Sequence, residues 1–309
     1  MGDAKPVRMS AKKSPWRTFI KNKELLLLTL PALAYFVIFH YLPMGGIYIA
    51  FTDYNYVDGI FGSPFVGLQW FRIFFRGDLM RVTRNTLGYG AAFIVLNLVT
   101  GVFTAIILGA VKRRAAVKVY QTIMIIPHFI SWIVVSLILY VFLDPMYGAV
   151  NNFFNIDSMW YANPGYWPFI LMFMNTWKSV GLGCVMYYAA MMGIDSTLYE
   201  AATIDGAGKI AQIRYITLPE LVPLMTILTI LSMGNLFRGD FGLFFSLPRD
   251  VGMLYPTTDI LDTYIYRGLR SGRLSLNAAS GLYQSVMGFF SIVAVNFIVR
   301  RISPDNSLF

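Results

Sequence analysis

Six long apolar stretches are the feature that most constrains the fold of this chain. A helix needs roughly 20 predominantly apolar residues to cross the hydrocarbon core of a membrane, and each stretch meets or approaches that length. Hydrophobic residues make up 57% of the 309 residues and charged residues only 13%, which is about half the usual charged share of a soluble domain. We therefore predict an all-α integral membrane protein with six transmembrane helices. Their predicted positions are Leu25–Phe51, Leu87–Val111, Tyr120–Leu143, Trp167–Ile194, Leu221–Phe237 and Ala278–Val299.

The start of this pattern separates a short basic segment from the membrane domain. Residues 1–24 are expected to form a cytoplasmic N-terminal segment, and residues 25–309 the transmembrane domain. The residues after the first apolar run are too bulky for a signal-peptide cleavage site, so this run is predicted to be a retained first span. Pro43, Gly45 and Gly46 mark the place at which this span could bend or break.

The basic residues are distributed as a membrane topology signal. With the N-terminus inside, the inner segments 1–24, 112–119, 195–220 and 300–309 carry 15 Lys and Arg, and the outer loops carry nine. Lys178 lies within a span. The inner excess predicts that both termini are cytoplasmic. Because the net charge of +9 follows this distribution, it does not indicate a nucleic-acid partner.

The loop between the fourth and fifth spans has the residues of a compact helix–turn–helix. Leu198–Ala202 is predicted to be a short helix with Asp195 or Ser196 as its N-cap, because short polar side chains accept hydrogen bonds from the first backbone N–H groups. Gly206 and Gly208 are predicted to make the turn. The sequence thus indicates a small protrusion on the cytoplasmic face.

A second helical piece should lead from this turn into the next span. It is predicted at Ala211–Ile216, and Pro219 and Pro223 are expected at the start of the fifth span, where a missing N–H costs least. The run from Asp205 to Lys209 is not a phosphate-binding loop, because the first glycine and the Ser or Thr after the lysine are absent. An ATPase would have to be another chain.

This loop resembles the EAA loop of the permeases of ATP-binding-cassette importers. The family pattern is Glu-Ala-Ala, three residues, Gly, nine residues, Ile, any residue, Leu-Pro, and seven positions of this chain match it at the right spacing within about 20 residues. With the aspartate beside the matching glycine, the candidate coupling residues are Glu200, Ala201, Ala202, Asp205, Gly206, Ile216, Leu218 and Pro219.

The resemblance implies a type I importer permease in a bacterial cytoplasmic (inner) membrane, with several partners. A second homologous permease would complete the pore, a dimer of ATPase subunits would dock below, and an external solute-binding protein would deliver the substrate. ATP and Mg would bind to the ATPase subunits, and no cofactor or metal to this chain. Glu200 would contact the ATPase and Gly206 would form the turn. Closure of the ATPases would then move the spans between inward-open and outward-open states.

Short sequence matches outside this loop, each less specific than the EAA pattern, narrow the resemblance to carbohydrate importers. The sequence around Trp177-Lys178 and the run Gly281-Leu282-Tyr283-Gln284-Ser285 are similar to permeases for polysaccharide-derived and uronate oligosaccharides, including bacterial alginate importers. The resemblance therefore implies an oligosaccharide substrate, and the narrower match implies one of the acidic, uronate type.

Polar residues within the spans are the candidates for a substrate path, since polar groups at membrane depth tend to face the bundle interior. By their distances from Glu200, Asn175 and Ser232 match pore-lining positions of the family. Each candidate has an alternative role as a hydrogen-bonding group between helices. The full set is Asn175, Ser232, Lys178, Trp177, Asn235 and His128.

Lys178 is the least ordinary of these residues, because it lies near the middle of the fourth span and the spans provide no obvious carboxylate for it. A buried ammonium without a carboxylate needs carbonyl groups, water or an anionic ligand. Two roles stay open: recognition of acidic sugars, or a structural bond to helix-end carbonyls or to the partner permease.

Two other classes of function were weighed against the importer. A polytopic membrane enzyme acting on lipid-linked sugars needs clustered acids or histidines, and the sequence offers only Asp259 and Asp262 at i, i+3 spacing. A proton-coupled transporter needs acids inside spans, which are nearly absent. Cys184 is a lone cysteine in an apolar run, so it indicates neither a disulfide nor a zinc site.

Overall fold

The computed structural model describes residues 23–302, so most of the predicted N-terminal segment 1–24 lies outside the described residues. Within that range the chain is helical, apart from one isolated bridge between Thr52 and Phe65. The described elements are α2 (Lys23–Phe36), η1 (Val37–Tyr41), η2 (Leu42–Phe51), α3 (Gly59–Gly62), α4 (Gln69–Arg76), α5 (Leu79–Gly109), α6 (Arg114–Phe129), α7 (Trp132–Leu143), α8 (Ala149–Phe154), α9 (Trp167–Met191), α10 (Ser196–Ile204), α11 (Lys209–Gln212), η3 (Ile213–Thr217), α12 (Leu218–Gly234), α13 (Phe241–Ser246), η4 (Gly252–Leu254), α14 (Tyr255–Thr258), α15 (Leu261–Arg270) and α16 (Leu274–Ile302).

Five helical runs among the described residues are long and apolar enough to cross a membrane. They are Leu27–Phe51, Leu79–Gly109, Trp167–Met191, Lys209–Gly234 and Leu274–Arg301. Each contains or overlaps a predicted span. The remaining predicted span, the third in chain order, corresponds to the pair α6 and α7. The all-α membrane fold predicted from the sequence is therefore confirmed.

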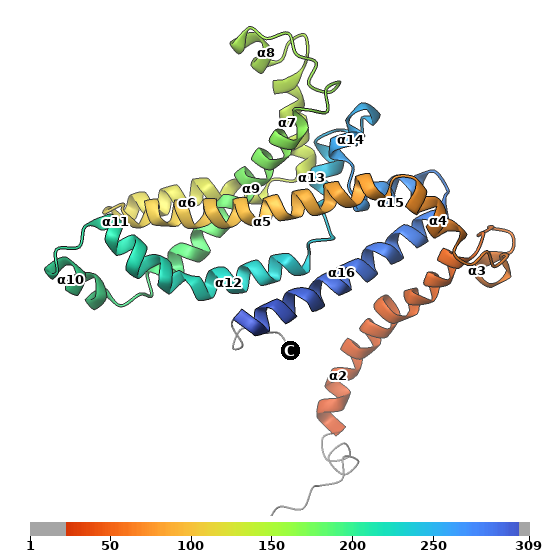
Figure 1. Cartoon of the computed structure of the whole chain (residues 1–309), viewed down its shortest axis with the longest axis horizontal. Helices are drawn as coiled ribbons and strands as arrows, with labels where there is room; N and C mark the ends of the chain where they lie inside the picture. Colours follow the sequence, from red (N-terminus) through yellow and green to blue (C-terminus); the bar gives the residue numbers. More distant parts are fainter. Residues whose placement is uncertain (1–22, 303–309) are drawn as a thin grey trace, which may run out of the picture.

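The third span is not the single helix predicted at Tyr120–Leu143. α6 and α7 are bent by 96° at a short break, and α7 leaves the body of the molecule with α8 at its far end (Figure 1). Ile130 is extended at the break, and the Ser131 hydroxyl accepts a hydrogen bond from the N–H of Val134 at 3.4 Å. Pro127 in the last turn of α6 removes a backbone donor, which weakens the helix just before the break.

Two spans pass a proline by widening locally instead of breaking. A five-residue π-helix precedes Pro43, with the N–H of Leu42 bonded to the carbonyl of Val37. The N–H of Leu218 bonds in the same way to the carbonyl of Ile213 just before Pro219. A π-turn is a wider turn with i→i+5 bonds, so it changes which carbonyls need a donor near the proline ring.

The start of the fifth span largely agrees with the prediction. The second helical piece predicted at Ala211–Ile216 is present as α11 and η3, and Pro219 lies in the first turn of α12 as expected, whereas Pro223 lies inside that helix. The difference is that the helical run is continuous from Lys209 to Gly234, so the predicted piece and the span form one helix. A movement of α11 is therefore transmitted directly along α12.

α9 lies at the centre of the helix packing, with α5 and α6 against it. A Cβ at Gly181 would overlap the backbone carbonyl of Met124 in α6, and Gly183 lies opposite Gly101 of α5. Small residues allow helix backbones to approach closely in membranes. The loop that carries α10 lies at one end of the molecule's long axis, and α15 lies at the other end (Figure 1).

Candidate functional site

The loop at about residues 195–220, which resembles the EAA loop, is called the coupling loop. The helix predicted at Leu198–Ala202 is present in it as α10, Ser196–Ile204. Asp195 is its N-cap, and its carboxylate accepts a hydrogen bond from the N–H of Thr197 at 2.9 Å. This bond holds the pKa of the Asp195 carboxyl below its ordinary value, because it favours the charged form. A negative charge at the start of a helix also interacts favourably with the helix dipole.

The turn after α10 depends on the backbone conformation of Gly206. Its φ of 81° lies in the left-handed region that glycine adopts without steric cost. The N–H of Gly206 bonds to the carbonyl of Thr203 at 3.1 Å, and that of Ala207 to the carbonyl of Ala202 at 2.8 Å. These two bonds form a Schellman motif, which ends α10 and fixes the direction of the chain toward α11.

Gln212 is a functional residue that the sequence analysis missed. Its side chain is buried, and its Nε2 donates to the Thr203 hydroxyl at 3.0 Å and to the Ala207 carbonyl at 3.3 Å. The Tyr199 and Thr217 hydroxyls add a second tie at 2.9 Å. These bonds join α10 to the start of the fifth span, so the loop can move with that span as one unit.

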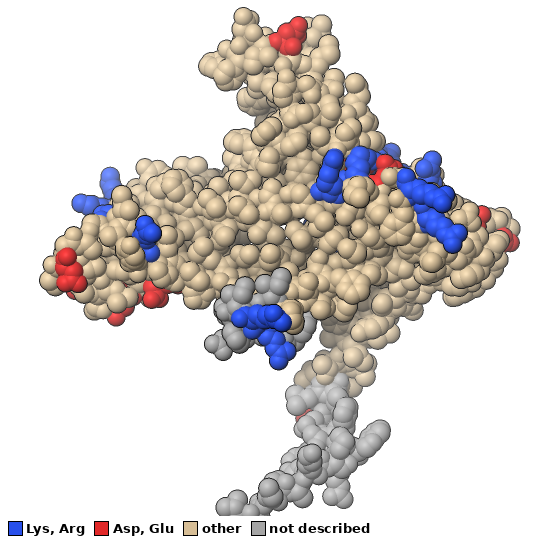
Figure 2. Space-filling view, in the orientation of Figure 1, with Lys and Arg blue, Asp and Glu red and all other residues tan. Residues whose placement is uncertain are grey.

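Several large apolar side chains of the coupling loop are exposed on the surface of the chain. Ile204 is 86% exposed, Ile210 82% and Tyr215 71%. Glu200 of α10 is exposed as well. Figure 2 shows acidic side chains at this end of the molecule. Large apolar side chains grouped on a polar loop are typical of a protein–protein contact.

Some of the predicted coupling residues are exposed on the surface of the loop, and the others anchor the loop to the rest of the protein. Glu200, Ala201, Asp205, Gly206 and Pro219 are exposed, whereas Ala202, Ile216 and Leu218 are half-buried. The second group packs toward the body of the protein. The structure therefore brings the matching residues together in one protrusion, with separate surface and anchoring members.

A polar pocket lies between the spans that flank this loop. Its volume is about 350 Å³, and α5, α6, α9 and α12 supply its walls. His128, Ser232 and Asn235, three of the predicted substrate-path residues, line it. Asn97 and Ser179 add a further amide and hydroxyl. Asn97 was missed, although an amide in the middle of the second span is the same signal that selected Asn175.

The other predicted path residues do not line this pocket. Asn175 is buried behind it, where its Nδ2 donates to the Oδ1 of Asn97 at 3.3 Å. Lys178 donates to the carbonyl of Ile130 at 2.6 Å. Trp177 lies on the surface of α9 and is 36% exposed. Asn175 can therefore orient Asn97, whereas the other two lie beside the break in the third span and at the surface.

The acids that suggested a membrane enzyme have structural partners. Asp259 is fully buried and forms ion pairs with Arg81, at 2.9 Å, and with Arg267. Burial lowers the pKa of the Arg267 guanidinium, but the charge and hydrogen bond of Asp259, together with Tyr255 and the hydrogen bond to Asp250, outweigh burial and the net pKa is raised. Asp262 accepts a hydrogen bond from the N–H of Gly239 at 2.8 Å. Neither carboxylate is left free for acid–base chemistry.

Comparison with known proteins identifies the chain's family. Residues 97–304 match the family described as the binding-protein-dependent transport system inner membrane component. The chain belongs to this family. It is therefore a multi-pass permease subunit of a transport system and not an enzyme, and the coupling loop and the polar pocket both lie within the matched region.

The permease is similar to characterised relatives over nearly its whole length. It is 33% identical to protein LplB of Bacillus subtilis (strain 168), with 97% of this chain and 96% of the relative covered. It is 32% identical to the polygalacturonan/rhamnogalacturonan transport system permease protein YteP of the same organism, over 93% and 90%. A solved bacterial transporter involved in the import of the acidic polysaccharide alginate matches with a TM-score of 0.84 at 30% identity, over 93% and 99%.

Proposed function

We propose that this permease forms half of the translocation path of an ATP-driven importer for an acidic oligosaccharide. The exposed apolar face of the coupling loop carries the proposal, since Ile204 and Ile210 are each more than four-fifths exposed on a rigid, doubly tied protrusion. Exposed apolar side chains on such a loop are typical of a site that binds a protein partner. The partner is an ATPase subunit, which binds ATP and Mg.

The coupling follows from the continuity of the loop with the fifth span. Docking fixes the positions of α10 and α11, and the unbroken helix from Lys209 to Gly234 ends at Asn235, which lines the polar pocket. ATP binding that favours one position of the loop therefore favours one state of the pocket. This is linkage through differential contacts in two states.

An ATP-driven importer also requires a second permease and a solute-binding protein. A second, homologous permease supplies the facing wall of the path, against the apolar surfaces that α2 and α7 leave exposed, and membrane lipid covers the rest. A periplasmic or extracellular solute-binding protein delivers the sugar. The inner excess of basic residues supports placing both termini in the cytoplasm.

An acidic oligosaccharide is supported by the relatives and by the pocket. One similar protein is a polygalacturonan/rhamnogalacturonan transport system permease, and another belongs to a transporter involved in the import of the acidic polysaccharide alginate. The amides of Asn97 and Asn235 and the hydroxyls of Ser179 and Ser232 offer the donors and acceptors that sugar hydroxyls need. A smaller anionic substrate is the competing candidate, because the sn-glycerol-3-phosphate permease UgpA of Escherichia coli is 29% identical over 89% of this chain.

The docking proposal is tested by charging the exposed face. Ile204→Asp and Ile210→Asp should leave the permease folded, because these side chains contact little of their own chain. Both should lose the ATPase subunits on co-purification. Met253→Asp is the matched control, since Met253 is 63% exposed in the loop between the fifth and sixth spans. Retention of the ATPase by both Ile variants would overturn the proposal.

The substrate proposal is tested separately with the assembled importer in proteoliposomes. ATP-dependent uptake should be measured for uronate oligosaccharides, for their carboxyl-reduced neutral forms and for sn-glycerol 3-phosphate. We expect uptake of the uronates. Equal uptake of the neutral sugars contradicts acidic selectivity, and uptake of glycerol phosphate alone contradicts the sugar assignment.

A further inference from the structure

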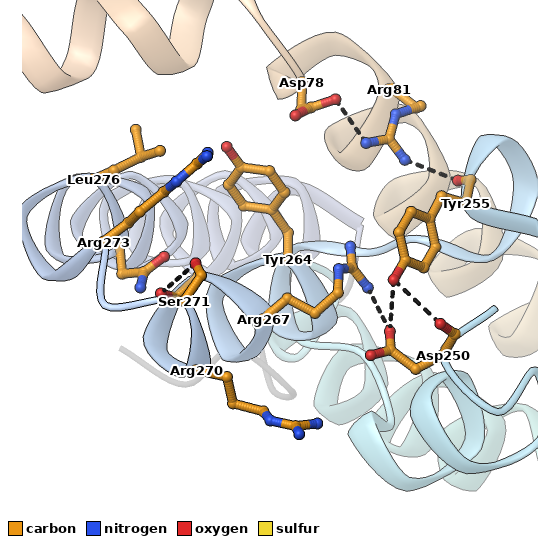
Figure 3. Close-up of a pocket in the computed structure, with 12 residues that line it drawn as sticks. Asp78, Arg81, Asp250, Tyr255, Tyr264, Arg267, Arg270, Ser271, Arg273 and Leu276 are labelled. Carbon is orange, nitrogen blue, oxygen red and sulfur yellow. Dashed lines mark hydrogen bonds and ion pairs between the residues drawn. The ribbon is translucent and has the colours of Figure 1, made fainter. Parts of the chain in front are cut away.

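A large cavity lies far from the coupling loop, at the end where α15 turns into α16. Its volume is about 630 Å³, within the range of roughly 300–1,000 Å³ typical of small-molecule sites. Its walls come from the start of α5, from α15 and from the first turn of α16 (Figure 3). With the coupling loop inside, this end faces the outer solution.

The frame of the cavity is fixed by ion pairs. The buried Asp259 binds both Arg81 and Arg267, and these arginines also pair with Asp78 at 2.6 Å and Asp250 at 3.2 Å, respectively. The guanidinium of Arg267 also lies over the ring of Tyr255, 3.9 Å from its centroid. These two arginines are therefore matched by acids, and they hold three separate segments in one geometry.

Two further arginines at the same cavity have no such match. Arg270 and Arg273 line it, are exposed, and form no ion pair or side-chain hydrogen bond within residues 23–302. Figure 3 draws both without an interaction to a neighbouring side chain. Guanidinium groups bind carboxylates in a planar, two-bond geometry. The cavity thus carries unused positive charge of the kind that suits a carboxylate.

Asn277 provides an independent observation at the same place. Its side chain lines the cavity and is only 3% exposed, yet neither its Nδ2 nor its Oδ1 has a hydrogen-bond partner. The amide fits there because residue 268 is glycine, and a Cβ at Gly268 would overlap it. Buried amides without partners are rare in folded proteins because leaving them unpaired is costly. An amide offers one donor and one acceptor face, which a sugar hydroxyl can satisfy together.

We propose that this cavity binds a uronate unit of an acidic oligosaccharide at the outer mouth of the permease. The carboxylate pairs with Arg273, a ring hydroxyl bonds to the Asn277 amide, and the ring lies against Tyr264. Arg270 points to the other side of α15 in Figure 3 and contributes its positive charge without a direct bond. The inference rests on the proposed import of acidic sugars. It adds a recognition site separate from the polar pocket between the spans.

The test measures direct binding of a uronate trisaccharide to the complete importer in nanodiscs, without binding protein or nucleotide. The double variant Arg270→Gln with Arg273→Gln should weaken binding by about tenfold or more, because the charge-assisted contact of Arg273 and the nearby charge of Arg270 are lost. The carboxyl-reduced sugar should bind the wild type and the variant equally weakly. Arg300→Gln with Arg301→Gln is the control, since it removes the same charge from the far end of α16.

A second variant separates recognition from folding. Asn277→Leu removes two unpaired buried atoms, so a purely structural Asn277 predicts equal or higher thermal stability and unchanged uronate affinity. The proposal predicts retained stability with weakened affinity. Unchanged affinity in both the arginine and the asparagine variants would overturn the site.

Two further measurements distinguish the ways in which the idea can fail. If the arginine variant weakens docking of the empty solute-binding protein but not sugar binding, the charges recognise an acidic protein surface and the proposal is wrong. If the wild-type importer takes up no oligosaccharide, the proposed function itself fails. If it takes up uronates while the cavity variants bind them normally, only the further inference fails.

Discussion

The ammonium of Lys178 lies 2.6 Å from the carbonyl oxygen of Ile130, at the break between α6 and α7. It also lies over the Trp132 ring, 4.2 Å from the centroid. The Trp132 indole N–H in turn donates to Asp240 at 2.6 Å, and Asp240 caps α13, with its carboxylate accepting from the N–H of Leu243. One lysine thereby links the fourth span to the broken third span, and through Trp132 to the loop that follows α12.

We predict that Lys178→Met destabilises the permease without changing its preference among sugars. The Ile130 carbonyl would lose its charged donor, which costs about 1–3 kcal/mol when the group stays buried. Thermal unfolding of the detergent-solubilised complex measures the loss, and uptake of neutral and uronate oligosaccharides should fall together. A loss confined to the uronates, at unchanged stability, would instead support recognition of acidic sugars by Lys178.

Two glycines in the coupling loop provide a matched pair for the next prediction. A Cβ would meet nothing within 4 Å at either Gly206 or Gly208, but φ is 81° at the first and −70° at the second. Gly206→Ala should therefore cost about 1–2 kcal/mol of loop stability through backbone strain alone, whereas Gly208→Ala should be nearly neutral. Stimulation of ATP hydrolysis by the loaded binding protein is the readout, and equal effects would contradict a conformational role for Gly206.

The buried charge of Asp259 leads to a stability prediction. Asp259→Asn leaves Arg81 and Arg267 facing a neutral side chain, and breaking a buried pair in this way costs about 3–5 kcal/mol, less here because the arginine side chains are 27% and 20% exposed. Asp78→Asn is the control, because its side chain is 47% exposed and surface pairs contribute about 0–1 kcal/mol. Thermal unfolding should separate the two variants clearly, and similar midpoints would show that the buried pair is not a stabilising frame.

The coupling loop was predictable because its signals are local. The Asp195 cap, the Gly206 turn and the spacing to Pro219 all act within a few residues of the backbone that they shape. Gln212 escaped prediction because its two acceptors, on Thr203 and Ala207, come together only after the turn has formed. A glutamine in isolation carries no sign of that contact.

The break in the third span could not be predicted from the residues close to it in the sequence. An apolar run from Tyr120 to Leu143 has the composition of one span, and Pro127 and Ser131 alone do not specify a 96° bend. The donor that binds the freed carbonyl of Ile130 is Lys178, 48 residues further along the chain. The role of that lysine was left open for the same reason, since its partner is a backbone group exposed only by the bend.

Ser232 allows the polar pocket to be tested without disturbing the fold. Its hydroxyl donates to the Leu228 carbonyl of its own helix at 2.8 Å, and the side chain is exposed toward the pocket of about 350 Å³. Ser232→Phe should therefore abolish sugar uptake by filling the pocket, while ATPase co-purification stays normal. Ser232→Ala keeps the space and should retain most of the uptake. If Ser232→Phe transports normally, the sugar does not pass through this pocket, because the benzyl group would narrow the pocket along the path of the sugar.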